Sequence, residues 1–162
     1  MKRYMTWQYV ENAIRSINNQ MKDTDWVPDL IIGIANGGSI PATLISKITG
    51  VPCKTFIVQL RDGEIQETID ADYLRFLLGK DPIKVLVVDD INDSGKTLEW
   101  IIGNWDWETE DTSIMFRIAT IHNNIASPIK VDFAYEEIDK EADPSLWIVY
   151  PWESFVDYTI YP

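Results

Sequence analysis

Val85-Leu-Val-Val-Asp-Asp-Ile-Asn-Asp-Ser-Gly-Lys-Thr97 is the stretch of this sequence that decides the fold. Its four leading apolar residues are typical of a buried parallel strand, and that strand is expected to end at Asp89 and Asp90. Turn-forming residues follow over 92–95, and apolar residues then recur at helical spacing over 97–102. We therefore expect a strand, an acidic turn and a helix in succession.

The turn carries groups that suit a phosphate. Ser94-Gly95-Lys96-Thr97 offers backbone amides, two hydroxyl groups, a lysine and the positive end of a helix dipole. Asp89 and Asp90 would repel a phosphate, so we expect them to accept hydrogen bonds from neighbouring hydroxyl groups or to hold a divalent cation. A ligand that carries a phosphate and a diol together is a ribose 5-phosphate.

Three other interpretations of this stretch explain less of it. A P-loop requires glycine where this chain has Asp90, and an EF-hand requires a bidentate glutamate where it has Ile101. A helix cap without a ligand needs one acidic or hydroxyl residue, whereas this turn has Asp89, Asp90, Asp93 and Ser94. A ligand site accounts for all four.

Bulk composition indicates one globular domain over residues 1–162. Hydrophobic residues make up 46% of the chain and charged residues 25%, and no apolar run approaches the roughly 18 residues of a membrane helix. The charged N-terminal segment 1–7 is not followed by an apolar stretch, so we expect no signal peptide and a cytoplasmic protein.

The net charge and the single cysteine and histidine argue against several kinds of partner and of metal site. The formal net charge of −12 disfavours nucleic acid and anionic membranes. Cys53 is the only cysteine and His122 the only histidine, which excludes an internal disulfide, a cysteine zinc site and a histidine metal cluster. A polyphosphate ligand would have to be attracted locally, by amides, a few cations and Mg²⁺. His122 is more typical of a structural or surface residue than of a catalyst.

The rest of the chain alternates helices with strands. Helical spacing or capping predicts helices over 7–21, with Thr6 as N-cap, over 39–49 and over 71–78. Strands are predicted over 30–35, 55–58, 114–121 and 131–135, the last at a sheet edge, with a strand-like aromatic tail over 146–153. This order predicts an α/β fold with a mostly parallel central sheet flanked by helices. In such sheets ligands bind at the carboxyl ends of strands, where Asn36, Asp89 and Asn123 are expected.

Two further segments have both a ligand-binding and a plain structural explanation. Gly37 and Gly38 let backbone amides approach an anion closely, although two glycines after a strand also make a simple tight turn. The charged, aperiodic segment 59–71 is predicted to be a loop. Arg61 in that loop either closes over an anion or lies on the solvated surface.

Val85–Thr97 resembles the phosphoribosyl pyrophosphate motif of the type I phosphoribosyltransferases: four apolar residues, two acids, two mostly apolar positions, Asp, a small hydroxyl residue, Gly, any residue and Thr. Asn92 stands where that motif usually has an aliphatic residue. The whole chain is similar to the bacterial xanthine-guanine phosphoribosyltransferases, through Thr6-Trp7, 34–41 and 147–153. The resemblance implies the type I fold with a small C-terminal hood.

The resemblance also implies a reaction. It is the transfer of 5-phosphoribosyl from phosphoribosyl pyrophosphate (PRPP) to guanine, xanthine or hypoxanthine, with release of pyrophosphate, in a homodimer or homotetramer that uses Mg²⁺. Asp93 would be the general acid/base, and Arg61 would assist at the pyrophosphate. The implied ligands of PRPP are Ser94, Gly95, Lys96 and Thr97 at the 5-phosphate, Asp89 and Asp90 at the ribose, with Asp90 also at Mg²⁺, and Asn36, Gly37 and Gly38 at the pyrophosphate.

At the base, the resemblance implies that Trp147 stacks on the purine and that the backbone of Ile148 contacts its edge. Two positions depart from the family. Asn36 replaces a common arginine or lysine, which affects pyrophosphate binding, and Asn123 replaces a lysine that donates to the purine's exocyclic oxygen. An Asn amide can donate to a carbonyl or accept from an amino group.

These departures motivate a second hypothesis, a non-catalytic binding module on the same fold. The intact Asp89, Asp90 and Asp93 favour an enzyme. A phosphate-receiving signalling domain would not account for Gly37-Gly38 or Trp147.

Overall fold

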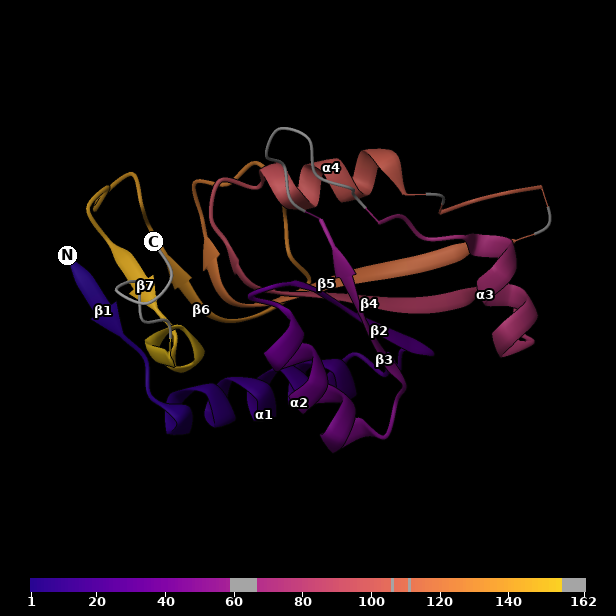
Figure 1. Cartoon of the computed structure of the whole chain (residues 1–162), viewed down its shortest axis with the longest axis horizontal. Helices are drawn as coiled ribbons and strands as arrows, with labels where there is room; N and C mark the ends of the chain where they lie inside the picture. The colour runs from indigo at the N-terminus through magenta and orange to yellow at the C-terminus, as the bar shows by residue number, and fades with distance from the viewer. Residues whose placement is uncertain (59–66, 106, 111, 156–162) are drawn as a thin grey trace.

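The computed structural model describes residues 1–58, 67–105, 107–110 and 112–155 of the chain (Figure 1). Five parallel strands form the central sheet in the order β3-β2-β4-β5-β6. Their bounds are β2 (Leu30–Ala35), β3 (Cys53–Ile57), β4 (Ile83–Asn92), β5 (Ile114–Asn124) and β6 (Phe133–Ile138). The predicted parallel α/β architecture is thus confirmed, with β6 at one edge.

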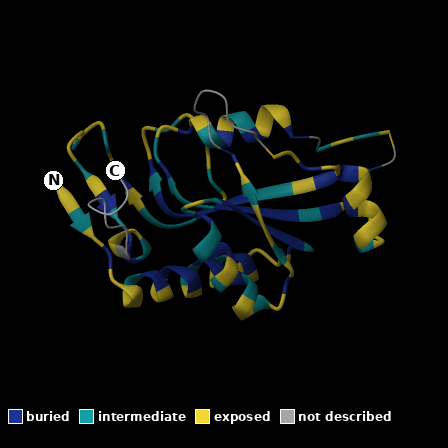
Figure 2. Ribbon diagram, in the orientation of Figure 1, coloured by how far each residue is buried: buried dark blue, intermediate teal, exposed yellow. Residues whose placement is uncertain are grey.

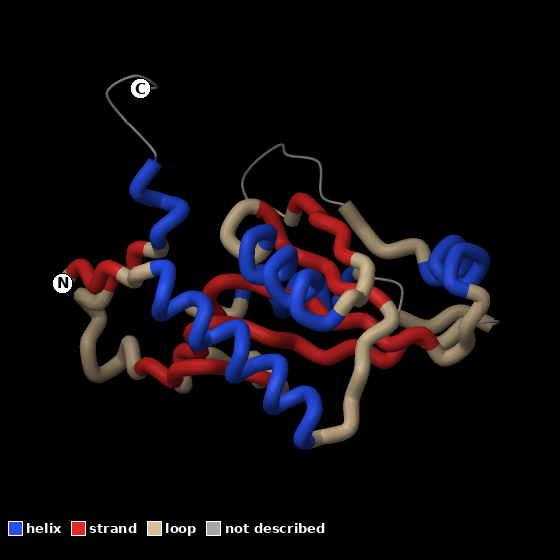
Figure 3. Tube along the Cα trace, turned by 90° about the horizontal axis from the view of Figure 1, so that it is seen from below, coloured by secondary structure: helices blue, strands red, loops and turns tan. Residues whose placement is uncertain are grey.

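Helices cover both faces of this sheet. They are α1 (Trp7–Asp23), α2 (Ser39–Thr49), α3 (Ala71–Leu78) and α4 (Lys96–Asn104). Along β4, Leu86 and Val88 pack with α1 and α2, whereas Val85 and Val87 pack with α3 and α4, as the two-residue period of a strand requires. Both faces of the central strands β2 and β4 are therefore largely buried (Figure 2), and Figure 3 shows α1 running across one face of the sheet. Among the described residues, no helix combines the length and the apolar character needed to cross a lipid bilayer.

A second, two-stranded sheet forms the hood. It pairs β1 (Lys2–Tyr4) with β7 (Trp147–Val149) in parallel, and the 3-10 helix η1 (Pro151–Phe155) follows directly. The hood therefore consists of β1, β7 and η1, drawn from opposite ends of the described chain (Figure 1). Sequence periodicity did not predict β1, because three residues are too few to show a period.

Three strands extend further at their carboxyl ends than the sequence predicts. The strand expected to end at Asp89 and Asp90 continues to Asn92, the one expected over 114–121 continues to Asn124, and the one expected over 131–135 continues to Ile138. Between the first two, mostly polar residues continue the ladder, with Ile91 opposite His122 and Asn92 opposite Asn123. The predicted turn over 92–95 is therefore limited to 93–95, and α4 begins at Lys96.

Candidate active site

Two aspartates near the carboxyl end of β4 contact the glycine turn that precedes α2. A Cβ added at Gly37 would lie 2.2 Å from Oδ2 of Asp90, and one added at Gly38 would lie 2.2 Å from the carbonyl oxygen of Val88. No side chain fits at either position. The fold thus brings the predicted pyrophosphate turn directly against Asp90.

The two helices that begin beside this turn and the acidic stretch lack side-chain caps. Thr6 caps α1 and Asp70 caps α3, each through its side-chain oxygen. By contrast, the N-cap residues of α2 and α4 are Gly38 and Gly95, which have no side chain to cap the helix. The first-turn amides of α2 and α4 remain available for an anion, whose negative charge the helix dipole favours.

A pocket of about 230 Å³ occupies the turn between β4 and α4 and is lined by residues 89–98. Gly95 has a φ of 80°, and a Cβ there would lie 2.5 Å from Oγ of Ser127. The loop after β5 therefore closes tightly over the turn, while the side chains of Ser94 and Lys96 stay exposed. The pocket has the polar groups and the size of a phosphate site.

Asp89 and Asp90 are adjacent and half-buried. Burial, together with the charge of Asp90, raises the pKa of Asp89 well above its ordinary value. Burial also raises the pKa of Asp90 to about 6. Two adjacent carboxylates of this kind are stabilised by a cation.

The site fits Mg²⁺ bound together with a substrate. Among the described residues no cluster of three or more acidic, histidine or cysteine side chains could hold a metal. Mg²⁺ commonly takes one or two carboxylates and completes its shell with water and substrate phosphates. Asp90, and Asp89 beside it, are the residues that would hold it.

Replacing Asp90 by Asn is expected to change stability in a pH-dependent way. The folded pKa of about 6 lies above the ordinary 3.8, so ionisation of Asp90 lowers the free energy of unfolding as pH rises through that window. Without Mg²⁺, the free energy of unfolding of D90N should exceed that of the wild type by about 1–2 kcal/mol near pH 7.5 and should differ little from it at about pH 4. Denaturant unfolding at both pH values measures the gap, with the exposed Asp23→Asn as control. An equal gap at both pH values contradicts the expectation.

Asp93 lies just beyond β4 and is held at both its side chain and its main chain. Nζ of Lys140 lies 2.9 Å from its Oδ2, and Nδ2 of Asn124 donates to its carbonyl oxygen at 2.9 Å. Asn124 also accepts from the backbone N–H of Lys140. One asparagine thus fixes the acid and its cation.

Asn92, the residue that departs from the family motif, is buried and fully engaged. Its Nδ2 donates to Oδ1 of Asn123 and to the carbonyl oxygen of Ile129, both at 2.9 Å. Its Oδ1 accepts from Oγ of Ser127 at 3.0 Å. An aliphatic residue could not make these contacts, so Asn92 joins β4 to β5 and to the loop after it.

The remaining predicted residues lie in three places. Trp147 is 57% exposed on β7, whereas its neighbour Ile148 is buried. Asn36 is exposed at the glycine turn, after a cis peptide bond to Ala35. Arg61 lies outside the described residues.

Sequence reasoning missed Lys140 and Asn124. Lys140 follows the edge strand β6, 47 positions from Asp93, and no local pattern relates the two. Asn124 stands in the polar run 122–124, where we singled out only the neighbouring Asn123 as a base contact. The tertiary fold is what brings both residues to Asp93.

Comparison with known proteins points to the same family as the resemblance found in the sequence. The model of the phosphoribosyl transferase domain matches residues 1–158. Hypoxanthine-guanine phosphoribosyltransferase of Saccharomyces cerevisiae is 26% identical, covering 94% of this chain and 86% of its own. Xanthine-guanine phosphoribosyltransferase of Cereibacter sphaeroides is 27% identical, with 79% and 71% covered.

Solved structures agree with the family match. The purine phosphoribosyltransferase of Pyrococcus horikoshii superposes with a TM-score of 0.70 at 31% identity, covering 96% of both chains. A family model that spans nearly the whole chain, with a site of matching chemistry at the end of β4, leaves one assignment. This chain belongs to the phosphoribosyl transferase domain family.

Proposed function

We propose that this chain is a purine phosphoribosyltransferase, which transfers the 5-phosphoribosyl group from PRPP to a purine and releases pyrophosphate. The carrying observation is the pocket lined by residues 89–98, which joins a half-buried aspartate pair to the open N-terminus of α4. An anion site beside a diol site is what a ribose 5-phosphate requires. The names of the relatives in several organisms support purine as the acceptor.

The phosphoribosyl group is held from two sides. Amides and hydroxyl groups of 94–97 bind the 5-phosphate, with Lys96 acting chiefly through its backbone because its side chain is exposed. Asp89 and Asp90 accept from the ribose hydroxyls. When bound, Mg²⁺ neutralises the leaving pyrophosphate and orients it. Asn36 and the amides of Gly37 and Gly38 hold the pyrophosphate, and Arg61 assists there.

At C1 of the ribose, the bond to pyrophosphate breaks before the bond to the purine nitrogen has fully formed. Positive charge therefore develops on the sugar. Fixing the sugar at both ends supplies most of the required positioning. Asp93 exchanges a proton with the purine imidazole as general acid/base. The ammonium group of Lys140 holds the carboxylate of Asp93, with Nζ 2.9 Å from Oδ2.

The base lies between the hood and the end of β5. Trp147 offers an exposed indole face for stacking, and the backbone of Ile148 contacts the base edge. Oδ1 of Asn123 already accepts from Asn92, so the amide group left to Asn123 is a donor. A donor favours the 6-oxopurines guanine, xanthine and hypoxanthine over adenine.

Pyrophosphate release from PRPP and Mg²⁺, with guanine, xanthine, hypoxanthine and adenine supplied singly, tests the proposal. Turnover with at least one 6-oxopurine and slower turnover with adenine is the expected result. Binding of PRPP without turnover on any base would support the non-catalytic module instead. We further propose a cytoplasmic homo-oligomer, which sedimentation of the purified protein would test.

A further inference from the structure

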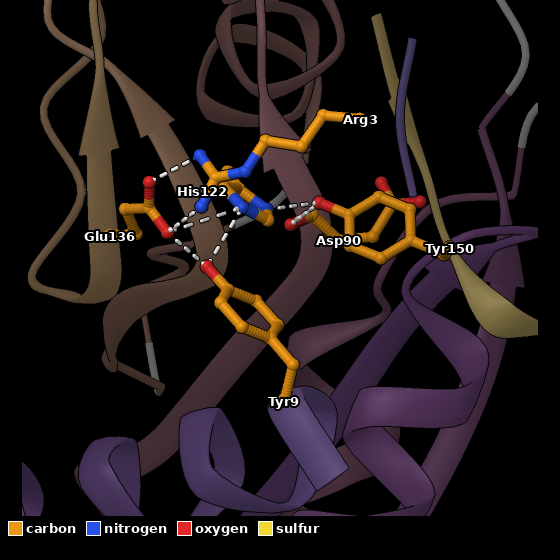
Figure 4. A network of polar contacts seen from close by, with 6 residues as sticks. All are labelled: Arg3, Tyr9, Asp90, His122, Glu136 and Tyr150. Atoms are coloured by element: carbon orange, nitrogen blue, oxygen red, sulfur yellow. Dashed lines mark hydrogen bonds and ion pairs between the residues drawn. The ribbon is translucent and has the colours of Figure 1, made fainter. Parts of the chain in front are cut away.

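A chain of buried and half-buried polar groups runs from the acidic site to the far edge of the sheet (Figure 4). The hydroxyl of Tyr150 donates to the carbonyl oxygen of Asp90 at 2.9 Å and lies 2.7 Å from Nδ1 of His122. Nε2 of His122 lies 2.9 Å from the hydroxyl of Tyr9, which donates to Glu136. We call Glu136, Tyr9, His122 and Tyr150 the tyrosine–histidine relay.

The tyrosine–histidine relay connects three neighbouring strands with the hood. Asp90, His122 and Glu136 lie on β4, β5 and β6 at nearly the same level, because His122 pairs with Ile91 on one side and with Glu136 on the other. Both strands of the hood reach this level as well. Arg3 of β1 binds Glu136 through two hydrogen bonds of 2.5 and 2.9 Å, and Tyr150 directly follows β7.

The protonation states of all four groups in the tyrosine–histidine relay can be assigned near pH 7. The hydrogen bonds from Arg3 lower the pKa of Glu136, so this side chain is a carboxylate that only accepts. A tyrosine hydroxyl has an ordinary pKa of about 10, so Tyr9 and Tyr150 both keep their protons near pH 7, and burial raises the pKa of Tyr9 further. Burial lowers the pKa of His122 to about 4, so its imidazole is neutral near pH 7.

Neutral His122 leaves the tyrosine–histidine relay one proton short. Four contacts need a proton each: Tyr150 to Asp90, Tyr150 to Nδ1, Nε2 to Tyr9, and Tyr9 to Glu136. The two hydroxyls and one imidazole N–H supply three. A hydrogen bond to a charged carboxylate is the strongest of the four, so Tyr9 keeps its proton and donates it in a hydrogen bond to Glu136.

The consequence passes along the chain to Tyr150. Since the Tyr9 oxygen then acts as acceptor, His122 carries its proton on Nε2, and Nδ1 is an acceptor. Tyr150 faces two acceptors, Nδ1 of His122 and the carbonyl oxygen of Asp90, with one proton. The hydroxyl of Tyr150 is the branch point of the network.

We propose that Tyr150 is a positioning residue for the PRPP site, whose single hydroxyl proton is shared between the Asp90 carbonyl and Nδ1 of His122. It thereby ties the seating of the hood, which carries Trp147 and Ile148, to the placement of Asp89 and Asp90. This inference rests on the proposed function, in which Asp90 contacts the ribose and Mg²⁺.

Nuclear magnetic resonance of ¹⁵N-labelled histidine tests the proton count without any activity. His122 is the only histidine, so its signals need no assignment to a residue, and Nε2 is told from Nδ1 by its coupling to both ring C–H protons. We expect an Nε2–H tautomer in the wild type and in Y150F. In Y9F the hydrogen-bond partner of Nε2 is lost, and Oε2 of Glu136, 3.9 Å away, is too far to replace it. The imidazole proton should therefore move to Nδ1 and be donated to Tyr150, whose own proton is then donated to the Asp90 carbonyl. An Nδ1–H tautomer in the wild type, or an unchanged tautomer in Y9F, overturns the inference.

Binding of PRPP with Mg²⁺, measured by calorimetry without base, tests the positioning role. Y150F should weaken binding about three- to tenfold, because the Asp90 carbonyl loses its donor, and the KM for the base should stay within about twofold. Y9F removes a hydroxyl from the same relay but should leave PRPP binding unchanged or tighter. The ring of Tyr150 stacks on Trp152 with centroids 4.8 Å apart, so Y150F keeps its packing.

A purely structural relay would give a different pattern. Y150F with wild-type affinity for PRPP, or equal losses in Y150F and Y9F, would overturn the positioning role. A wild type that binds PRPP without turnover would contradict the proposed transferase while leaving this comparison intact.

Discussion

Asp93→Asn lowers turnover about 10²–10⁴-fold, the range that a positioned general acid/base contributes, while the affinity for PRPP changes little. Asn keeps the shape of the side chain but does not accept a proton at neutral pH. The main chain at residue 93 stays fixed, because Asn124 donates to its carbonyl oxygen at 2.9 Å. Steady-state kinetics with varied PRPP and varied base separates the effect on kcat from that on KM.

The exposed Asp23 at the end of α1 supplies a matched control for this charge change. D23N should keep both constants. Turnover by D93N at the wild-type rate would remove Asp93 from the catalytic role. A change confined to the KM for the base would instead make Asp93 a binding group.

Alanine at the two turn glycines produces large effects of different kinds. In G37A the new methyl group would meet the Asp90 carboxylate at 2.2 Å, so that side chain must leave its position. Affinity for PRPP with Mg²⁺ should fall about 10- to 100-fold, as expected when hydrogen bonds to a charged group are lost. The fold should persist, since Asp90 lies at the sheet's end.

In G38A the methyl group would meet main-chain atoms instead, the Val88 carbonyl oxygen at 2.2 Å and Cα of Asp89 at 2.8 Å. Backbone of the central strand cannot yield easily, so the free energy of unfolding should drop by about 3 kcal/mol or more.

Gly103 in α4 is the control for both glycine variants, because nothing lies within 4 Å of its Cβ position. G103A should raise stability slightly, by about 0.5–1 kcal/mol, through helix propensity. Thermal unfolding and PRPP titration of the three variants give the comparison. Wild-type PRPP affinity in G37A would show that the turn and Asp90 move apart freely.

The regular elements could be predicted where local chemistry marks both ends. Gly50 follows α2 and Gly79 follows α3, and each glycine has a left-handed backbone, with φ of 75° and 61° respectively. Asp70 caps α3 at its start. Their predicted bounds match the structure. The turn that leads into α4 could also be predicted, because its small and polar residues are contiguous over residues 92–95.

What the sequence did not reveal depends on contacts between distant segments. The extension of β4 past Asp89 follows from pairing with His122 and Asn123 on β5, although polar residues argue for a strand end. Lys140 reaches Asp93 only because β6 lies beside β5. The hood pairs residues about 145 positions apart, as Arg3 with Ile148 shows.

That pairing also sets an order of assembly during synthesis. β1 leaves the ribosome first, and β7, its pairing partner among the described residues, is complete only when Val149 has emerged. The strands of the central sheet are all made earlier, and domains begin to fold as their segments emerge. The proposed ribose-phosphate part of the site, on β4 and α4, is therefore made before Trp147, the proposed platform for the purine.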